Sequence, residues 1–127
     1  MFRYPDLYRT GIAVAGPANQ LLYNSIYQER YMGLPADNPQ GYRDGSPINF
    51  AQNLKGNLLL VHGTGDDNVH YQNTEQLVDR LIALNKQFSL MVYPNRTHQI
   101  SEGETTQLHL FTMMTGYLRD HLPPGGR

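Results

Sequence analysis

The chain has 127 residues, of which 39% are hydrophobic and 17% are charged, and its formal net charge is −1. This composition is typical of a globular protein, and the length corresponds to one domain or part of one, since domains contain about 100–200 residues. The balanced charge argues against nucleic-acid binding, which needs a basic surface. No apolar run approaches the roughly 18 residues of a membrane span, and no signal peptide is expected. The absence of cysteine excludes disulfides and thiolate nucleophiles.

The first half of the chain contains one predicted strand between two less regular segments. Residues 2–10 are expected to contain a helix, with Pro5 in or just before its first turn. The apolar run at residues 12–15 lies between glycines and predicts a buried strand. Tyrosines three or four residues apart predict a short helix with an aromatic face over residues 23–31. Repeated glycine and proline then indicate loops or short helices through residue 49.

The second half of the chain alternates strands and helices. Residues 57–62 form an uninterrupted apolar run ending at Gly63, as expected of a strand covered on both faces. Asn73 or Thr74 is expected to cap a helix that extends to about Leu84. Residues 88–93 predict a third strand, which Pro94 ends.

The last predicted helix covers residues 105–121 and ends at the Pro-Pro-Gly-Gly run of residues 123–126. Its buried stripe is expected to consist of five apolar residues: Leu108, Phe111, Met114, Leu118 and Leu122. Strands that alternate with helices favour an α/β fold, with three parallel strands and helices packed on the faces of the sheet.

Two predicted loops at the carboxyl ends of strands carry polar side chains suited to catalysis. Asp66 follows the second strand and His98 follows the third. Ligands of open parallel sheets bind at this edge, and neighbouring strands lie about 4.8 Å apart. An aspartate that accepts the Nδ1–H of a histidine leaves Nε2 free to act as a general base. Asp before His is also the chain order of the α/β-hydrolase triad, whose nucleophile comes first.

No serine occupies a nucleophile position in this sequence. The serines are Ser25, Ser46, Ser89 and Ser101, and none lies in a Gly-x-Ser-x-Gly motif or between a strand and a helix. Other interpretations of these loops therefore stay open. Asp67 is expected to be a turn residue. His62 is expected to pack at its strand end, although a metal site formed by His62, Asp66 and His98 is a weaker alternative.

Three segments carry a specific resemblance. Residues 23–33, with the sequence YNSIYQERYMG, residues 63–70, with the sequence GTGDDNVH, and the loop around His98 resemble segments of dipeptidyl peptidase IV-like members of the prolyl oligopeptidase family of serine peptidases. The matches keep the same order and similar spacing over nearly the whole chain. The resemblance implies that residues 1–127 are the C-terminal portion of an α/β-hydrolase catalytic domain. The segment with the nucleophile serine and the N-terminal β-propeller of the family are absent.

The resemblance also implies roles for particular residues. Asp66 and His98 match the aspartate and histidine of the catalytic triad. The substrate-binding positions of the family match five residues here: Tyr23, Tyr27, Asn68, Val69 and Arg30. Of these, Asn68 matches an amide that binds a substrate carbonyl, and Arg30 matches an arginine near the substrate's amino terminus. The other three match the walls of the pocket for proline or alanine.

The implied function is that of a serine exopeptidase that releases dipeptides with proline or alanine in the second position. The chain alone is expected to be inactive, and no cofactor or metal is expected. A non-catalytic interaction module that has lost the nucleophile is the alternative, and a metal-dependent hydrolase is a weaker one. We expect a homo-oligomer through residues 105–121. The compartment stays open, although the resemblance suggests a periplasmic, secreted or membrane-anchored protein.

Overall fold

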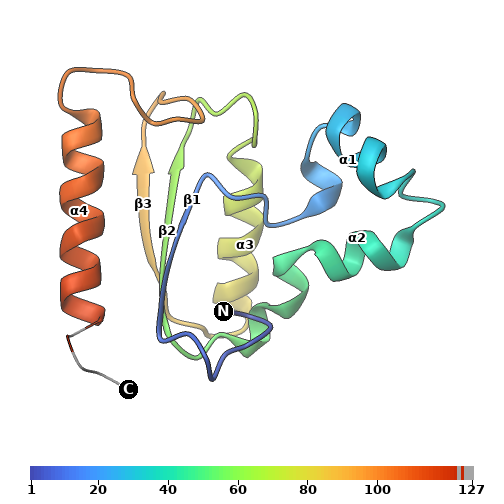
Figure 1. The fold of residues 1–127 in the computed structure, drawn as a ribbon, viewed down its shortest axis with the longest axis horizontal. Coiled ribbons are helices and arrows are strands. Elements are labelled where there is room, and N and C mark those ends of the chain that lie inside the picture. Colours follow the sequence, from blue (N-terminus) through green and yellow to red (C-terminus); the bar gives the residue numbers. More distant parts are fainter. Residues whose placement is uncertain (123, 125–127) are drawn as a thin grey trace.

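The computed structural model describes residues 1–122 and 124. The elements in chain order are β1 (Thr10–Val14), the 3-10 helix η1 (Gln20–Leu22), α1 (Ser25–Met32), α2 (Pro39–Gly45), the 3-10 helix η2 (Pro47–Asn53), β2 (Asn57–Gly63), α3 (Gln72–Ala83), β3 (Ser89–Tyr93) and α4 (Thr106–His121). Figure 1 shows a sheet with α3 on one face and α4 on the other, while α1 and α2 extend from the side of α3. No helix among the described residues is long and apolar enough to cross a membrane.

The sheet has three parallel strands in the order β1-β2-β3, as predicted. The uninterrupted apolar run at residues 57–62 lies in the central strand β2, which is covered on both faces. Leu58 and Leu60 pack with α3 and η2 on one face, while Leu59 and Val61 pack with α4 on the other. Successive side chains of a strand point to opposite faces, so a strand between two helical layers needs apolar residues at every position.

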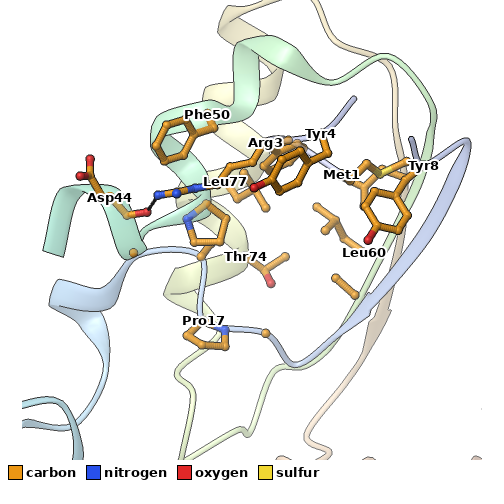
Figure 2. Close-up of a pocket in the computed structure, with 17 residues that line it drawn as sticks. Met1, Arg3, Tyr4, Tyr8, Pro17, Asp44, Phe50, Leu60, Thr74 and Leu77 are labelled. Carbon is orange, nitrogen blue, oxygen red and sulfur yellow. Dashed lines mark hydrogen bonds between the residues drawn. The ribbon is translucent and has the colours of Figure 1, made fainter. Parts of the chain in front are cut away.

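The amino-terminal segment differs from the prediction. Residues 2–10 contain turns and no helix, so the expected helix is wrong. The Leu7 N–H donates to the Tyr4 carbonyl at 3.2 Å, with Pro5 at the second position of the turn, where its fixed φ is favourable. Figure 2 shows this segment above a cavity of about 500 Å³, where Met1 and Tyr4 face side chains of β2 and α3.

The start of α3 also differs from the prediction. The helix begins at Gln72, and neither Asn73 nor Thr74 caps it. Both side chains are buried and bonded to other elements. The Asn73 Oδ1 accepts from the Asn19 N–H at 3.1 Å, and the Thr74 Oγ1 lies 2.7 Å from the Nδ1 of His62. The α1 helix begins later than expected, at Ser25, because the side chain of Asn24 caps it.

The packing face of α4 differs most from the prediction. Of the predicted stripe, Leu108, Phe111, Leu118 and Leu122 are exposed. The face against the sheet carries Leu110 with the half-buried Met113, Met114 and Tyr117. The helix ends at His121 as expected. Of the terminating run at residues 123–126, only residue 124 belongs to the described part of the chain.

Candidate active site

The loops after β2 and β3 lie side by side at the carboxyl ends of these parallel strands (Figure 1). Gly63, the last residue of β2, pairs with Tyr93, the last residue of β3. A Cβ at Gly63 would lie 2.2 Å from the Arg96 carbonyl oxygen, so only glycine permits this approach. The Thr64 N–H donates to the Tyr93 carbonyl at 3.0 Å, and the Gly65 N–H donates to the Arg96 carbonyl at 3.0 Å. These bonds fix the two loops relative to one another.

The joined loops bring Asp66 and His98 into contact. The Nδ1 of His98 lies 2.9 Å from the Oδ2 of Asp66. The Asp66 side chain has no exposed area, whereas 37% of the His98 side chain is exposed. Because a carboxylate only accepts hydrogen bonds, Nδ1 carries the proton and Nε2 keeps its lone pair. In the described part of the chain Nε2 makes no hydrogen bond, so it is available to a substrate or a nucleophile.

Four donors surround the Asp66 carboxylate. Oδ1 accepts from the backbone N–H groups of Asn68 and Val69, both at 2.9 Å. Oδ2 receives His98 at 2.9 Å and His62 at 3.0 Å. Burial alone raises the pKa of Asp66, but the hydrogen bonds from His98, Asn68 and Val69 and the charge of His98 outweigh it, so the pKa is lowered. The carboxylate is therefore ionised at neutral pH.

A polar pocket of about 430 Å³ lies beside the loop that carries Asp66, and its walls include Tyr23, Asn24, Asp67, Asn68 and His70. The hydroxyl of Tyr23 donates to the Oδ1 of Asn68 at 3.1 Å, which leaves the Asn68 amide N–H groups free to donate elsewhere. The same Asn68 contacts Asp66 through its backbone N–H. The pocket and the Asp–His pair therefore share a residue.

Comparisons with known proteins identify the family of this chain. The family model described as the prolyl oligopeptidase family matches residues 1–124. The chain belongs to the prolyl oligopeptidase family. It is 41% identical over 116 residues to prolyl endopeptidase FAP of Mus musculus and 39% identical over 116 residues to dipeptidyl peptidase 4 of Bos taurus, covering 89% of this chain and 15% of each relative. The chain thus spans about one seventh of these relatives.

A solved structure has a similar fold. Dipeptidyl peptidase 4 of Porphyromonas gingivalis matches 94% of this chain and 17% of its own chain, with a TM-score of 0.91 and 40% identity. The predicted fold, the C-terminal portion of an α/β-hydrolase, and the predicted family are confirmed.

Tyr27, Val69 and Arg30 are the other residues implied by resemblance to the prolyl oligopeptidase family, and Val69 among them contacts Asp66 through its backbone N–H. The Tyr27 ring packs edge-on against Tyr23, with centroids 5.5 Å apart, and is 53% exposed. The Val69 side chain is buried, and its backbone holds Asp66. The Arg30 guanidinium is exposed and lies 5.7 Å from the ring centroid of Tyr31. The structure therefore brings Tyr23 and Asn68 together and places Tyr27 against Tyr23, while Arg30 is exposed on α1.

The serines of this chain either are hydrogen-bonded to other residues or belong to other elements. Ser46 is buried, where its hydroxyl donates to the Tyr42 carbonyl at 2.6 Å and accepts from the Gln20 N–H at 2.9 Å. Ser89 begins β3 and Ser25 begins α1. Among residues 1–122 and 124, no serine hydroxyl is bonded to His98.

Sequence reasoning missed two residues, His62 and Glu102, whose hydrogen bonds hold the active-site residues and loops in place. It expected His62 to pack at its strand end, or in the weaker alternative to bind a metal, yet His62 donates to Asp66. It also missed Glu102, whose carboxylate accepts from the Thr97 hydroxyl, from the Thr97 N–H at 3.1 Å and from the Ser101 N–H at 3.2 Å. The Thr97 hydroxyl is the main cause that lowers the pKa of Glu102. The position of His62 four residues before Asp66 was the available signal, whereas nothing in the sequence distinguishes Glu102 from a solvated loop residue.

The geometry of His62, Asp66 and His98 differs from that of a metal centre. Over the described residues, no three His, Asp or Glu side chains are arranged to hold a metal ion. The two imidazoles instead point N–H groups at the Asp66 carboxylate, and those nitrogens have no lone pair for a metal.

Proposed function

We propose that this chain supplies the aspartate and histidine of the catalytic triad of a serine exopeptidase that removes dipeptides with proline or alanine in the second position. The contact that supports the proposal most directly is the 2.9 Å hydrogen bond between His98 Nδ1 and the buried, ionised Asp66. Membership of the prolyl oligopeptidase family and the likeness to dipeptidyl peptidases support the same activity.

The proposed mechanism assigns one role to each partner. A serine hydroxyl from outside residues 1–127 attacks the substrate carbonyl, and Nε2 of His98 takes its proton. Asp66 stays ionised and stabilises the imidazolium that forms. His98 then returns the proton to the leaving amine. Water repeats the cycle and releases the dipeptide from the acyl-enzyme.

The pocket beside the Asp66 loop, with Tyr23 and Asn68 in its wall, supports the proposed substrate class. The free N–H groups of Asn68 can donate to a carbonyl of the amino-terminal dipeptide, because its Oδ1 is already occupied by Tyr23. The rings of Tyr23 and Tyr27 offer flat apolar surface suited to a proline ring or an alanine methyl group. Asn68 is exposed, so a hydrogen bond from its amide to that carbonyl would contribute about 0.5–1.5 kcal/mol.

A kinetic assay with a matched control tests the activity. The full-length protein that contains this segment should hydrolyse fluorogenic Gly-Pro and Ala-Ala substrates, and His98→Ala should abolish turnover. His70→Ala removes a neighbouring exposed histidine and should keep the chemical step. The isolated 127-residue chain should show no hydrolysis. Turnover by that chain, or full activity of His98→Ala, would refute the proposal.

A non-catalytic interaction module is the second candidate, because within the described residues His98 has no serine partner. Reading the gene ahead of Met1 separates the two functions. A Gly-x-Ser-x-Gly motif there supports the peptidase, and another residue in place of its serine supports the module.

We also propose that α4 forms a homo-oligomer interface. Leu108 is 70% exposed and Phe111 is 59% exposed, on the side of α4 that faces away from the sheet. Apolar side chains gathered on one exposed helix face are typical of an interaction surface. Phe111→Glu should convert the oligomer to a monomer in light scattering, whereas Gln107→Glu adds the same charge at an exposed polar position of the same helix. A monomeric parent protein would contradict this interface.

A further inference from the structure

His62 is a buried histidine that the proposed catalytic mechanism does not use. It lies in β2, one residue before the strand ends, and has no exposed area. Its Nε2 is 3.0 Å from the Oδ2 of Asp66 and 2.8 Å from the carbonyl oxygen of Val69. Its Nδ1 is 2.7 Å from the hydroxyl of Thr74 on α3. Every polar atom of this imidazole therefore has a partner inside the protein.

The partners determine which nitrogen donates. A carboxylate and a carbonyl can only accept, so Nε2 must carry a proton that is shared between Asp66 and Val69. The hydroxyl of Thr74 can donate or accept, so it satisfies Nδ1 in either protonation state of the ring. The edge-on ring of Tyr71, with its centroid 5.6 Å away, packs against His62. The donor at Nε2 is thus a fixed part of the Asp66 environment.

We propose that His62 is a positioning residue that orients Asp66 toward His98. A carboxylate offers about four lone-pair sites, and here four N–H groups occupy them. With both oxygens held from two sides, the carboxylate cannot rotate about χ2, and the direction in which Oδ2 receives the His98 N–H is fixed. Without His62, one site on Oδ2 is free, so the carboxylate can turn or take a water molecule.

The same contacts connect the site to the rest of the fold. Thr74 belongs to the first turn of α3, and the chain of hydrogen bonds runs from Thr74 through His62 to Asp66 and His98. Thr74 lies inside the helix rather than at its cap position, and its hydroxyl faces His62. The position of the catalytic pair therefore depends on α3 as well as on the two loops.

The kinetic test rests on the proposed peptidase activity and uses the full-length protein. His62→Phe keeps the ring but removes both nitrogens, and His62→Gln places an amide N–H near the position of Nε2. A small misplacement of a catalytic group can cost about 10²-fold in rate, so His62→Phe should lower kcat about 10- to 100-fold with little change in KM. His62→Gln should recover most of the loss. His109→Phe, which loses a bond to Tyr93 instead, should leave kcat unchanged.

A spectroscopic test needs no activity and uses the 127-residue chain. The Nδ1–H proton of His98 should give a low-field NMR resonance, protected from exchange by its bond to Asp66. His62→Phe should broaden or shift that resonance, whereas His62→Gln and His109→Phe should preserve it. An unchanged resonance in a folded His62→Phe chain would overturn the positioning role, as would a folded His62→Gln chain that resembles His62→Phe. If the full-length parent cleaves no peptide, the proposed function fails while this resonance still tests His62.

Discussion

Ile100 is expected to anchor the His98 loop at a measurable cost in backbone strain. It lies two residues after His98, its side chain has no exposed area, and it packs against Leu59, Val61 and Leu110. Its φ is 49°, in the left-handed region that β-branched residues rarely adopt. The buried side chain must therefore stabilise the loop by more than the strain destabilises it.

Two truncations separate these contributions. Ile100→Ala should lower the free energy of unfolding by about 2–5 kcal/mol, because it leaves a cavity in a fully buried site. Any residue with a Cβ pays about 1–2 kcal/mol in the left-handed region, and glycine does not. Ile100→Gly should therefore be at least as stable as Ile100→Ala, although glycine within regular structure is ordinarily less stable than alanine by about 0.5–1 kcal/mol.

Leu81 provides the matched control, because it is also fully buried but lies within the helix α3. There Leu81→Gly should be less stable than Leu81→Ala by about 1 kcal/mol. Urea unfolding of the four variants, followed by circular dichroism, measures both differences. The reasoning is refuted if glycine is less stable than alanine by the same amount at both positions. In the full-length protein, Ile100→Ala should also lower kcat, since its side chain holds the loop of His98.

Three further predictions concern the proposed active site. Asp66→Asn should lower kcat about 10⁴-fold in assays of peptide hydrolysis. The asparagine amide can donate to His98 Nδ1 and so stabilise the tautomer in which Nε2, rather than Nδ1, carries the proton. The folded-state pKa of Asp66 lies below its ordinary value of 3.8, so its contribution to stability is complete above that pH and lost as the pH falls through the lowered pKa. Urea midpoints should fall more from neutral to acid pH in the parent than in Asp66→Asn, because the lowered pKa of Glu102 contributes a loss of its own in both proteins. Asn68→Ala should raise KM for Gly-Pro substrates roughly 2- to 10-fold, as expected when a hydrogen bond worth about 0.5–1.5 kcal/mol is lost, and Tyr23→Phe should raise it less.

The layers of the fold and the central pair were predictable because they depend on local patterns. The apolar run at residues 57–62 reports burial on both faces of β2, which Leu58 and Leu59 confirm by packing on opposite sides. Asp66 and His98 follow adjacent strands, so topology alone predicts their proximity. The same reasoning could not find His62, because its partner depends on the turn that brings Asp66 back over the strand end.

The sequence predictions were wrong where tertiary contacts decide between arrangements that the local sequence favours equally. Helix α4 has apolar residues on two faces, and periodicity does not show whether Leu110 or Phe111 faces the sheet. Asn73 and Thr74 are good capping residues, but both side chains are used by segments far away in the sequence. In each case the deciding partner is more than ten residues distant, beyond what a local pattern records.

The structure separates the rigid part of the site from the adaptable part. Asp66 and His98 are fixed by backbone bonds between two loops, by the close approach at Gly63 and by His62. The pocket residue Tyr23 instead belongs to the segment around α1, whose only buried residue is Gln28. Segments with few buried contacts open and move most easily. Substitutions in α1 should therefore alter which peptide is bound, through KM, while leaving the orientation of the Asp–His pair unchanged.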